Sequence, residues 1–542
     1  MVITRNFQLF HRLRTLPTHH IRVRNRLVLS SRIKSKTIYL PPTIRYYSSD
    51  SDHSKDKASS GMTPTSQPLS NAVESYWNDI ATYFHEPGFF RFSSDRSQSA
   101  IKDTAFMHKL LSSAIASQRG QGDLLPSVIT RSCCELYESL NDEGKIEFLR
   151  ILARDFGVPR DKSVNLAQEY IKIAQQDPYS KAAMRAEQIL RHAMSPSHNK
   201  FFDRVNQLPD GMKFLVDMRA DLLRFISLNR DDNYLPMLSN SLKEKLQEWL
   251  IGFLKLERIT WNSPAVVLEK ISQYEAVHAV SDLGDLKRRV GPGRRVFGFF
   301  FRNMPNEPLV FVQVALVPEI SNNVQEILNA PSVHPTAESI RCAIFYSITT
   351  QKGLTGIELG NFLIKRVVRD LANEFPQLQT FCTLSPIPGF RRWLEQLPKA
   401  ELLISKEKST LQDAGLTIGD FGELIKNNAW VKDVHTTSIL RPILMRLCSR
   451  YILKEKRGDL ALDPVANFHL RNGACAHRLN WMADTSVKGL HESFGIMVNY
   501  NYLLKHIERN NQRYLLDGTI PVSSDDPVLN EHLCDRVIRV DE

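Results

Sequence analysis

The chain has 542 residues, of which 42% are hydrophobic and 24% are charged, a composition typical of a globular protein with two or three domains. Its net charge of +11 arises in the first 49 residues, which hold ten Lys and Arg and no Asp or Glu. The rest of the chain carries 60 basic and 59 acidic residues. This balance does not favour binding to nucleic acid or to a membrane surface.

The seven cysteines are scattered, with no CxxC pair and no regular spacing. This pattern favours neither a zinc site nor a disulfide framework, and we expect no bound metal. A membrane helix requires about 18 or more consecutive apolar residues. The sequence has no such stretch, and we expect no stable membrane insertion.

Residues 1–47 are rich in Arg, Ser, Thr and Leu and lack acidic residues. This composition is typical of a mitochondrial transit peptide, and a disordered Ser-, Asp- and Lys-rich linker is predicted over residues 48–70. A basic tail that binds RNA is the alternative. The predicted C-terminal tail, residues 526–542, does not end in the peroxisomal address Ser-Lys-Leu. We therefore expect the protein in the mitochondrial matrix.

Residues 71–253 have the pattern of consecutive helices whose polar faces carry charges of both signs. Asn141 is a candidate N-cap and Ser163 a candidate helix start. The segments 212–228 and 241–256 are also predicted to be helical. Catalytic residue types do not cluster in this part of the sequence. We therefore predict a helical oligomerisation domain over residues 71–253.

After residue 253 short apolar segments alternate with turns. Strands are predicted at 296–301, 309–317, 342–348 and 378–384, and residues 400–456 are predicted to be helical again. Residues 463–473 are predicted to form a loop that leads to an apolar segment at 479–482. The predicted fold class is α+β multidomain, with an N-terminal all-α domain followed by an α/β domain over residues 254–525.

A glycine-bearing loop, GLTGIELG at 353–360, lies between the strand predicted at 342–348 and an amphipathic helix. Apolar residues recur every four positions in that helix, at Leu359, Leu363, Val367 and Leu371. Glycines let a backbone approach a ligand, and the free N–H groups and dipole at a helix start favour phosphate. The predicted phosphate-binding residues are Thr355, Gly356, Ile357, Glu358, Leu359, Gly360 and Asn361.

Five separated segments resemble one protein family, in the family's order: FYSITTQKGLTGIELGNFLIKRVV, TLSPIPGFRRWL, ALDPVANFHLRNGA, LNWMAD and VNYNYL. They are similar to the malonyl-CoA decarboxylase family, and the similarity covers about residues 75–525. The resemblance implies an acetyltransferase-like (GNAT) fold for residues 254–525, with the CoA diphosphate at the glycine loop. It also implies conversion of malonyl-CoA to acetyl-CoA and CO2 without a metal or organic cofactor. A homo-oligomer, a tetramer in the family, and a role in regulating fatty-acid oxidation are implied as well.

The family's catalytic serine falls on Ser385 and its catalytic histidine on His469. We predict that His469 donates a proton to the enolate carbon, because the unperturbed pKa of histidine lies near 6.5. Ser385 is predicted to hydrogen-bond the carboxylate or enolate and to orient His469; no G-x-S-x-G motif marks it as a nucleophile. Tyr502 is predicted to support the substrate site by hydrogen bonding, with a packed aromatic as the alternative. Cys382 is interpreted as a core residue.

Two other classes of function remain open. The fold could serve acyl transfer from CoA to an amine, which would release free CoA, whereas decarboxylation leaves the thioester intact. The chain could also be a non-catalytic mitochondrial protein that binds RNA through its basic end. Salt-dependent RNA retention by the chain without residues 1–47 would indicate the latter function.

Overall fold

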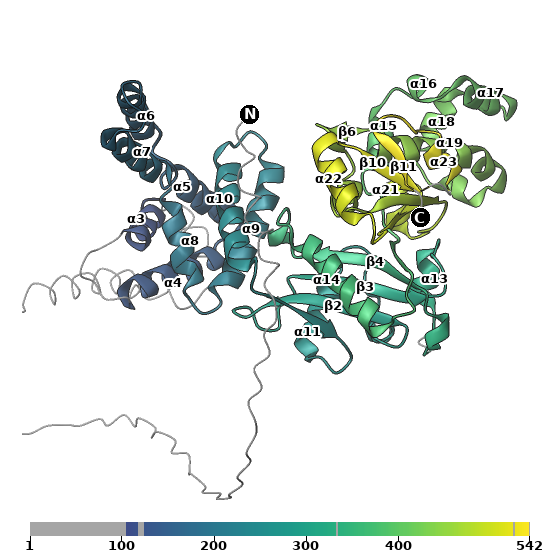
Figure 1. The fold of residues 1–542 in the computed structure, drawn as a ribbon, viewed down its shortest axis with the longest axis horizontal. Coiled ribbons are helices and arrows are strands. Elements are labelled where there is room, and N and C mark those ends of the chain that lie inside the picture. Colours follow the sequence, from purple (N-terminus) through teal and green to yellow (C-terminus); the bar gives the residue numbers. More distant parts are fainter. Residues whose placement is uncertain (1–103, 117–123, 332–333, 524–525, 541–542) are drawn as a thin grey trace, which may run out of the picture. The chain divides into compact units, whose positions relative to one another are not determined.

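The structure is a computed structural model that describes residues 104–116, 124–331, 334–523 and 526–540 (Figure 1). The predicted transit peptide, the predicted linker and the first part of the predicted helical domain lie outside the described residues. All described residues belong to one compact unit, Gly88–Glu542.

The described chain begins with helices only. In order they are α3 (Thr104–Ile115), α4 (Leu124–Ser139), α5 (Asp142–Arg154), α6 (Arg160–Ala174), α7 (Lys181–Met194), α8 (His198–Asn206), α9 (Gly211–Leu228) and α10 (Tyr234–Leu250). Asn141 caps α5 as predicted, because its side chain accepts the N–H of Gly144. Helix α6 begins at Arg160, directly after Pro159, so Ser163 lies inside the helix and does not start it. None of the described helices is long and apolar enough to cross a membrane.

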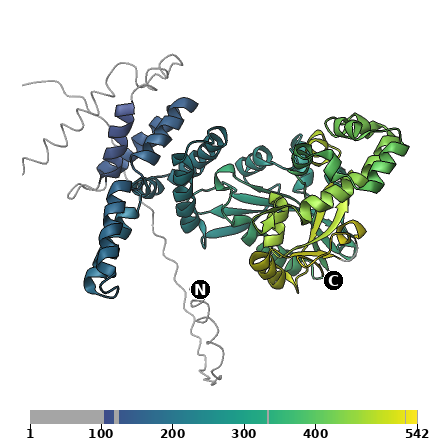
Figure 2. The ribbon, with the colours of Figure 1, turned by 90° about the horizontal axis from the view of Figure 1, so that it is seen from above.

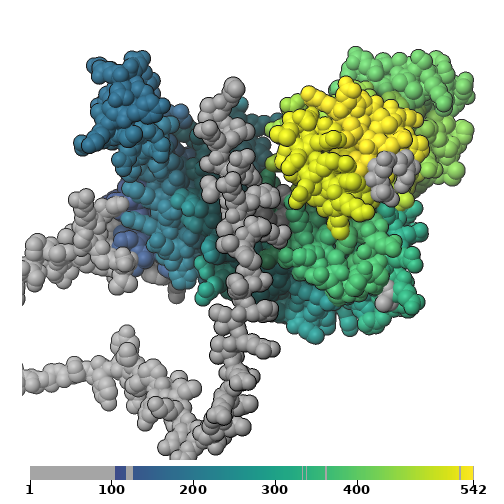
Figure 3. Space-filling view, viewed as in Figure 1, coloured from purple at the N-terminus to yellow at the C-terminus, as the bar shows by residue number. Residues whose placement is uncertain are grey.

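Helices α6 and α7 form a hairpin, drawn in blue (Figure 1 and Figure 2). Helix α6 has no buried residue, and Ala183 is the buried residue of α7. The hairpin exposes large apolar side chains, namely Val164, Ile171, Tyr179, Met184, Ile189 and Met194. It projects at the top left of the space-filling view (Figure 3). Burial among the described residues therefore contributes little to the stability of the hairpin.

Nine strands of the described chain form one mixed sheet, in the order β1-β2-β3-β4-β5-β9-β8-β10-β11. They are β1 (Leu254–Ile259), β2 (Arg294–Phe301), β3 (Val310–Val317), β4 (Cys342–Thr350), β5 (Thr380–Thr383), β8 (Cys475–Asn480), β9 (Met497–Asn501), β10 (Ile520–Ser523) and β11 (Val537–Val540). Strands β1 to β4 are antiparallel neighbours, β4 and β5 are parallel, and β9 is antiparallel to both β5 and β8. Strands β8, β10 and β11 are parallel. Because β11 joins the sheet, the sheet extends beyond residue 525, the predicted limit of the α/β domain.

The remaining elements cover the sheet or extend from it. The helices are α11 (Ala265–Tyr274), α12 (Leu283–Arg289), α13 (Val324–Asn329), α14 (Leu359–Glu374), α15 (Phe390–Gln396), α16 (Lys399–Leu402), α17 (Ser405–Asp413), α18 (Ile418–Leu424), α19 (Val434–Leu453), α20 (Pro464–Arg471), α21 (Val487–Ser493), α22 (Ile507–Asp517) and α23 (Pro527–Asn530). Short 3-10 turns are η1 (Ala337–Ser339), η2 (Lys352–Leu354) and η3 (Ala429–Lys432), and β6 (Lys456–Arg457) pairs with β7 (Leu460–Ala461).

The predicted unit of strand, loop, helix and strand is confirmed as β4, η2, α14 and β5. The four apolar residues predicted along one face of α14, from Leu359 to Leu371, are fully buried. Helix α14 packs against β2 and β3. Strand β3 is buried at every position except Val317, as expected for a continuous apolar run covered on both faces.

The segment 463–473 differs from the prediction, because most of it is the helix α20. Asp463 caps this helix by accepting the N–H groups of Val465 and Ala466 at 3.0 and 2.9 Å. Pro464 occupies the first helical position, where its fixed φ suits a helix and its missing N–H removes no hydrogen bond. The Asp-Pro pair is therefore a helix-start signal in the sequence.

Candidate active site

Ser385 and His469 are far apart in sequence and meet in the structure. Oγ of Ser385 lies 3.1 Å from Nε2 of His469, and both side chains are buried. Ser385 follows β5 and pairs with Val498 of β9 through two backbone hydrogen bonds of 2.8 and 3.0 Å. His469 lies on α20. The serine before Pro386 is thus fixed by the sheet and is not an open turn residue.

The second ring nitrogen of His469 is also occupied. Nδ1 lies 2.8 Å from Oη of Tyr502. Tyr502 directly follows β9, and its backbone N–H donates a hydrogen bond to Phe381 O of β5. The imidazole stacks on the ring of Tyr500, with ring centroids 4.8 Å apart. These contacts fix both the position and the rotation of the imidazole. Tyr502 lies behind His469 and contacts the imidazole.

Thr383 is a site residue that the sequence argument missed. Its Oγ1 accepts hydrogen bonds from the hydroxyl of Ser385 at 2.8 Å and from the N–H of Tyr500 at 3.0 Å. Thr383 and Ser385 are two positions apart along an extended segment, so their side chains lie on the same face. That spacing is the signal that could have identified Thr383.

Ser385 and His469 line a cavity of about 220 Å³. The other lining residues are mostly apolar: Val277, Phe345, Tyr346, Ser347, Ile348, Thr350, Pro386, Pro464, Val465 and Phe468. Pockets for drug-sized ligands measure about 300 Å³ or more. The cavity is therefore suited to a short acyl group and not to an entire cofactor-sized molecule.

Burial lowers the pKa of His469 to about 3, because a charged imidazole loses its water in this apolar setting. The unperturbed pKa near 6.5, on which the sequence argument relied, therefore does not apply to the ligand-free cavity. Burial likewise raises the pKa of Tyr502 well above its usual value. At neutral pH both rings are uncharged, and a single hydrogen bond joins them.

The predicted phosphate loop lies next to α20 but does not line the cavity. Gly356 has a φ of 80°, a left-handed conformation that glycine adopts without strain. A Cβ atom on Gly360 would lie 2.9 Å from the ring of Phe468, which does line the cavity. Glu358 pairs with Arg471 of α20 at 2.7 Å. The loop is therefore in direct contact with the helix that carries His469.

The seven predicted loop residues do not have equal access to a ligand. Thr355, Gly356 and Glu358 are exposed. Ile357 and Leu359 are buried, so their side chains anchor the loop to the core. Asn361 belongs to the first turn of α14.

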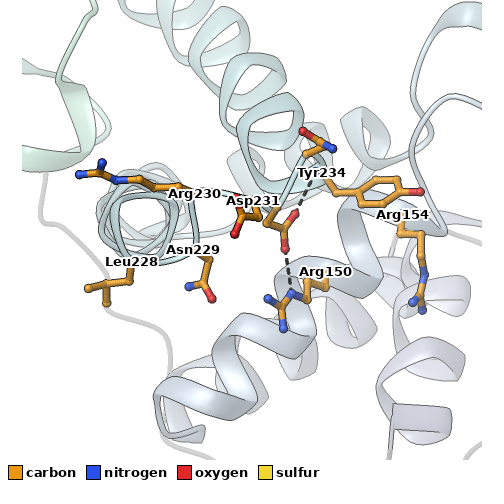
Figure 4. Close-up of a pocket in the computed structure, with 9 residues that line it drawn as sticks. Arg150, Arg154, Leu228, Asn229, Arg230, Asp231 and Tyr234 are labelled. Atoms are coloured by element: carbon orange, nitrogen blue, oxygen red, sulfur yellow. Dashed lines mark hydrogen bonds and ion pairs between the residues drawn. The ribbon is translucent and has the colours of Figure 1, made fainter.

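A second cavity, of about 550 Å³, lies between the end of α5 and the turn from α9 to α10 (Figure 4). It is larger, but it contains none of the predicted site residues. Two of its arginines are already paired, Arg150 with Asp232 at 2.9 Å and Arg154 with Asp155 at 2.8 Å. Its lining holds three arginines and two aspartates, and once Asp155, the partner of Arg154, is included, charges of the two signs are equal in number, so the cavity does not clearly favour an anion or a cation.

Cys382, beside the serine turn, is fully buried, and burial raises the pKa of its thiol, in agreement with a core role. The described residues contain no group of three or more His, Cys, Asp or Glu side chains arranged to hold a metal ion.

Because two histidines are buried, we expect the fold to be less stable at acidic pH. Burial lowers the pKa of His469 to about 3 and that of His198 to about 4. Below pH 6.5 both histidines bind a proton in the unfolded chain but stay neutral in the folded protein. The free energy of unfolding therefore falls as the pH falls. Between pH 7 and pH 5 each histidine should lower the free energy of unfolding by about 2 kcal/mol.

Urea unfolding at pH 7 and pH 5 measures this effect. The variant His198→Gln should lose about 2 kcal/mol less than the parent over the same interval. Equal losses in parent and variant would show that His198 titrates normally in the fold.

The fold and this site define an enzyme, in which a buried serine and histidine face a small apolar cavity beside a loop at a helix start. A family model described as the malonyl-CoA decarboxylase C-terminal domain matches residues 252–535, and the corresponding N-terminal domain matches residues 156–250. The chain belongs to the malonyl-CoA decarboxylase family.

Individual relatives agree with this assignment. The mitochondrial malonyl-CoA decarboxylase of Anser anser anser is 41% identical over 401 residues, which cover 71% of this chain and 79% of that protein. The Mus musculus protein of the same name is 43% identical over 396 residues, which cover 70% of this chain and 80% of that protein. The crystal structure of malonyl-CoA decarboxylase from Rhodopseudomonas palustris has a TM-score of 0.69 and 34% identity, and the match covers 79% of this chain and 99% of that one.

Proposed function

We propose that this protein decarboxylates malonyl-CoA to acetyl-CoA and CO2 in the mitochondrial matrix, and so controls malonyl-CoA and the rate of fatty-acid oxidation. The observation that carries the proposal is the hydrogen-bonded series Ser385, His469 and Tyr502 at the wall of a cavity sized for an acyl group. Relatives at 41% and 43% identity bear the name of this activity. Their names also support the mitochondrial location.

The first step is loss of the carboxylate. The mostly apolar cavity removes water from the malonyl carboxylate, which favours release of neutral CO2. The electron pair of the breaking C–C bond moves into the thioester and forms an enolate. The hydroxyl of Ser385 turns from Thr383 toward the carboxylate or the enolate oxygen and stabilises its charge by hydrogen bonding.

The second step is protonation of the enolate carbon by His469. An anion in the cavity favours the charged imidazole, so the bound malonyl group raises the pKa of His469 from its low value in the ligand-free cavity. The imidazolium then donates from Nε2 to carbon, while its Nδ1–H donates to Oη of Tyr502. The steps use only side chains of this protein, and no metal or organic cofactor enters them.

Residues 254–525 are inferred to have the acetyltransferase-like arrangement, with the CoA diphosphate at Thr355–Asn361. The succession of β4, η2 and α14 supports this arrangement, because a loop that opens a helix offers N–H groups to phosphate. The contacts of Gly360 with Phe468 and of Glu358 with Arg471 support it further. They set the loop beside the acyl cavity, where the two ends of one ligand can be bound together.

The chain is also inferred to form a homo-oligomer, a tetramer, through its helical part. The apolar side chains exposed along α6 and α7 support this inference, since such patches mark interaction surfaces. An apolar partner surface would cover the patch, and a second copy of the hairpin offers such a surface.

The test is release of CO2 from malonyl-CoA by the purified protein, with acetyl-CoA formed in equal amount. An acyltransferase would instead release free CoA from acetyl-CoA in the presence of amines. If the protein releases no CO2 from malonyl-CoA but does release CoA from acetyl-CoA in the presence of amines, its function is acyl transfer and not decarboxylation. Absence of both reactions would contradict an enzymatic role on CoA thioesters.

A further inference from the structure

The phosphate loop is held in place by a buried arginine from the helical part of the chain. Arg219 of α9 donates through Nη1 to Gly353 O and through Nη2 to Thr355 O, the latter at 3.0 Å. A Cβ atom on Gly353 would overlap Val216 O of the same helix. Helix α9 thus contacts the base of the loop directly, and only glycine fits at that contact.

Arg219 lacks the partner that a buried guanidinium normally has. Only 3% of the residue is exposed, and among the described residues no carboxylate pairs with it. Its Nε has no hydrogen-bond acceptor in the part of the chain that the structure describes, and burial lowers the pKa of Arg219 to about 10. A buried charge without a counter-charge is costly. An anion bound at the loop would offset this cost.

The contact with Arg219 also orients the loop backbone. In a trans peptide the C=O and the following N–H point in opposite directions. Because Arg219 binds Thr355 O, the N–H of Gly356 is directed away from α9. This N–H donates no hydrogen bond within the described part of the chain, so it is available to a ligand oxygen.

A second cation from the helical part lies at the same place. Nζ of Lys243, on α10, lies 3.8 Å from the position of a Cβ atom on Gly356. Lys243 is partly buried, and within the described residues it forms no ion pair or hydrogen bond. Its neighbour Lys245 differs, because it pairs with Asp203 at 2.9 Å.

We propose that α9 and α10 complete the diphosphate site: Lys243 is a direct phosphate ligand and Arg219 is a positioning residue for the loop. This inference rests on the proposed function, in which the loop binds the CoA diphosphate. The site is then formed by the loop Thr355–Asn361 together with helices α9 and α10. The bound diphosphate supplies the counter-charge for Arg219 and Lys243. The acyl cavity takes no part in this contact.

Calorimetric binding of CoA and of pantetheine, which lacks the diphosphate, tests the proposal without turnover. Lys243→Met should raise the Kd for CoA about ten-fold and leave the Kd for pantetheine unchanged. Lys245→Met is the matched control and should change neither value. Lys243→Arg should restore most of the affinity for CoA.

Arg219→Met should weaken CoA binding at least as much, with unchanged pantetheine binding. Urea unfolding of each variant tells whether the fold persists. Unchanged CoA affinity in Lys243→Met, or an equal change for CoA and pantetheine, would overturn the proposal. These outcomes are distinct from failure of the proposed function, which would appear as parental protein that binds CoA but releases no CO2 from malonyl-CoA.

Discussion

The variant His469→Ala is expected to turn over malonyl-CoA about 10²- to 10⁴-fold more slowly than the parent, the usual contribution of a positioned general acid. His469 is the proposed proton donor and lies next to Ser385 in the cavity, and alanine would leave water as the proton source for the enolate. Steady-state formation of acetyl-CoA measures the effect.

Binding of CoA serves as the control, because the proposed diphosphate loop, Thr355–Asn361, does not include the imidazole. It should remain within a factor of two or three of the parental value. Parental turnover by His469→Ala would remove this residue from the mechanism.

The variant Ser385→Ala is expected to lose about 10²- to 10³-fold in turnover, the scale for one lost hydrogen-bond donor to a developing negative charge. The hydroxyl lies 3.1 Å from Nε2 of His469, so its loss also removes one of the contacts that orient the imidazole. Michaelis constants should change less than turnover numbers, because the affected bond strengthens as charge develops.

Ser449→Ala is a suitable control for the loss of a buried serine. Ser449 is fully buried and donates to Val528 O at 3.1 Å, away from the cavity lining. The Ser449→Ala variant should keep the parental turnover, and it shows how the loss of a buried hydroxyl alone affects the enzyme. If both serine variants keep parental turnover, Ser385 has no role in the reaction.

Local patterns in the sequence predict the parts of the site that depend on local structure. The spacing of Leu359 to Leu371 predicts α14, and the glycines before it predict a loop whose backbone can approach a ligand. In the structure Gly356 of this loop has a left-handed conformation. Helix α20 could also have been predicted from the sequence, because Asp is a preferred N-cap residue and Pro is a preferred first helical residue, as in Asp463-Pro464.

Other features depend on contacts between distant segments, and no local pattern reveals them. The low pKa of His469 results from burial by residues of several strands and helices. The contact of Arg219 with Gly353 and Thr355 spans more than a hundred residues. In the sequence Arg219 is one of many charged residues on an amphipathic helix, so its burial is visible only once the elements are packed.

The contact between Gly360 and Phe468 has a consequence for how this loop can vary. A methyl group at residue 360 would lie 2.9 Å from the aromatic ring of Phe468 and would press on it. That ring lines the acyl cavity, so it would have to move within the cavity wall. The size of the residue at 360 is therefore linked to the shape of the acyl cavity, although glycine itself has no group that takes part in chemistry.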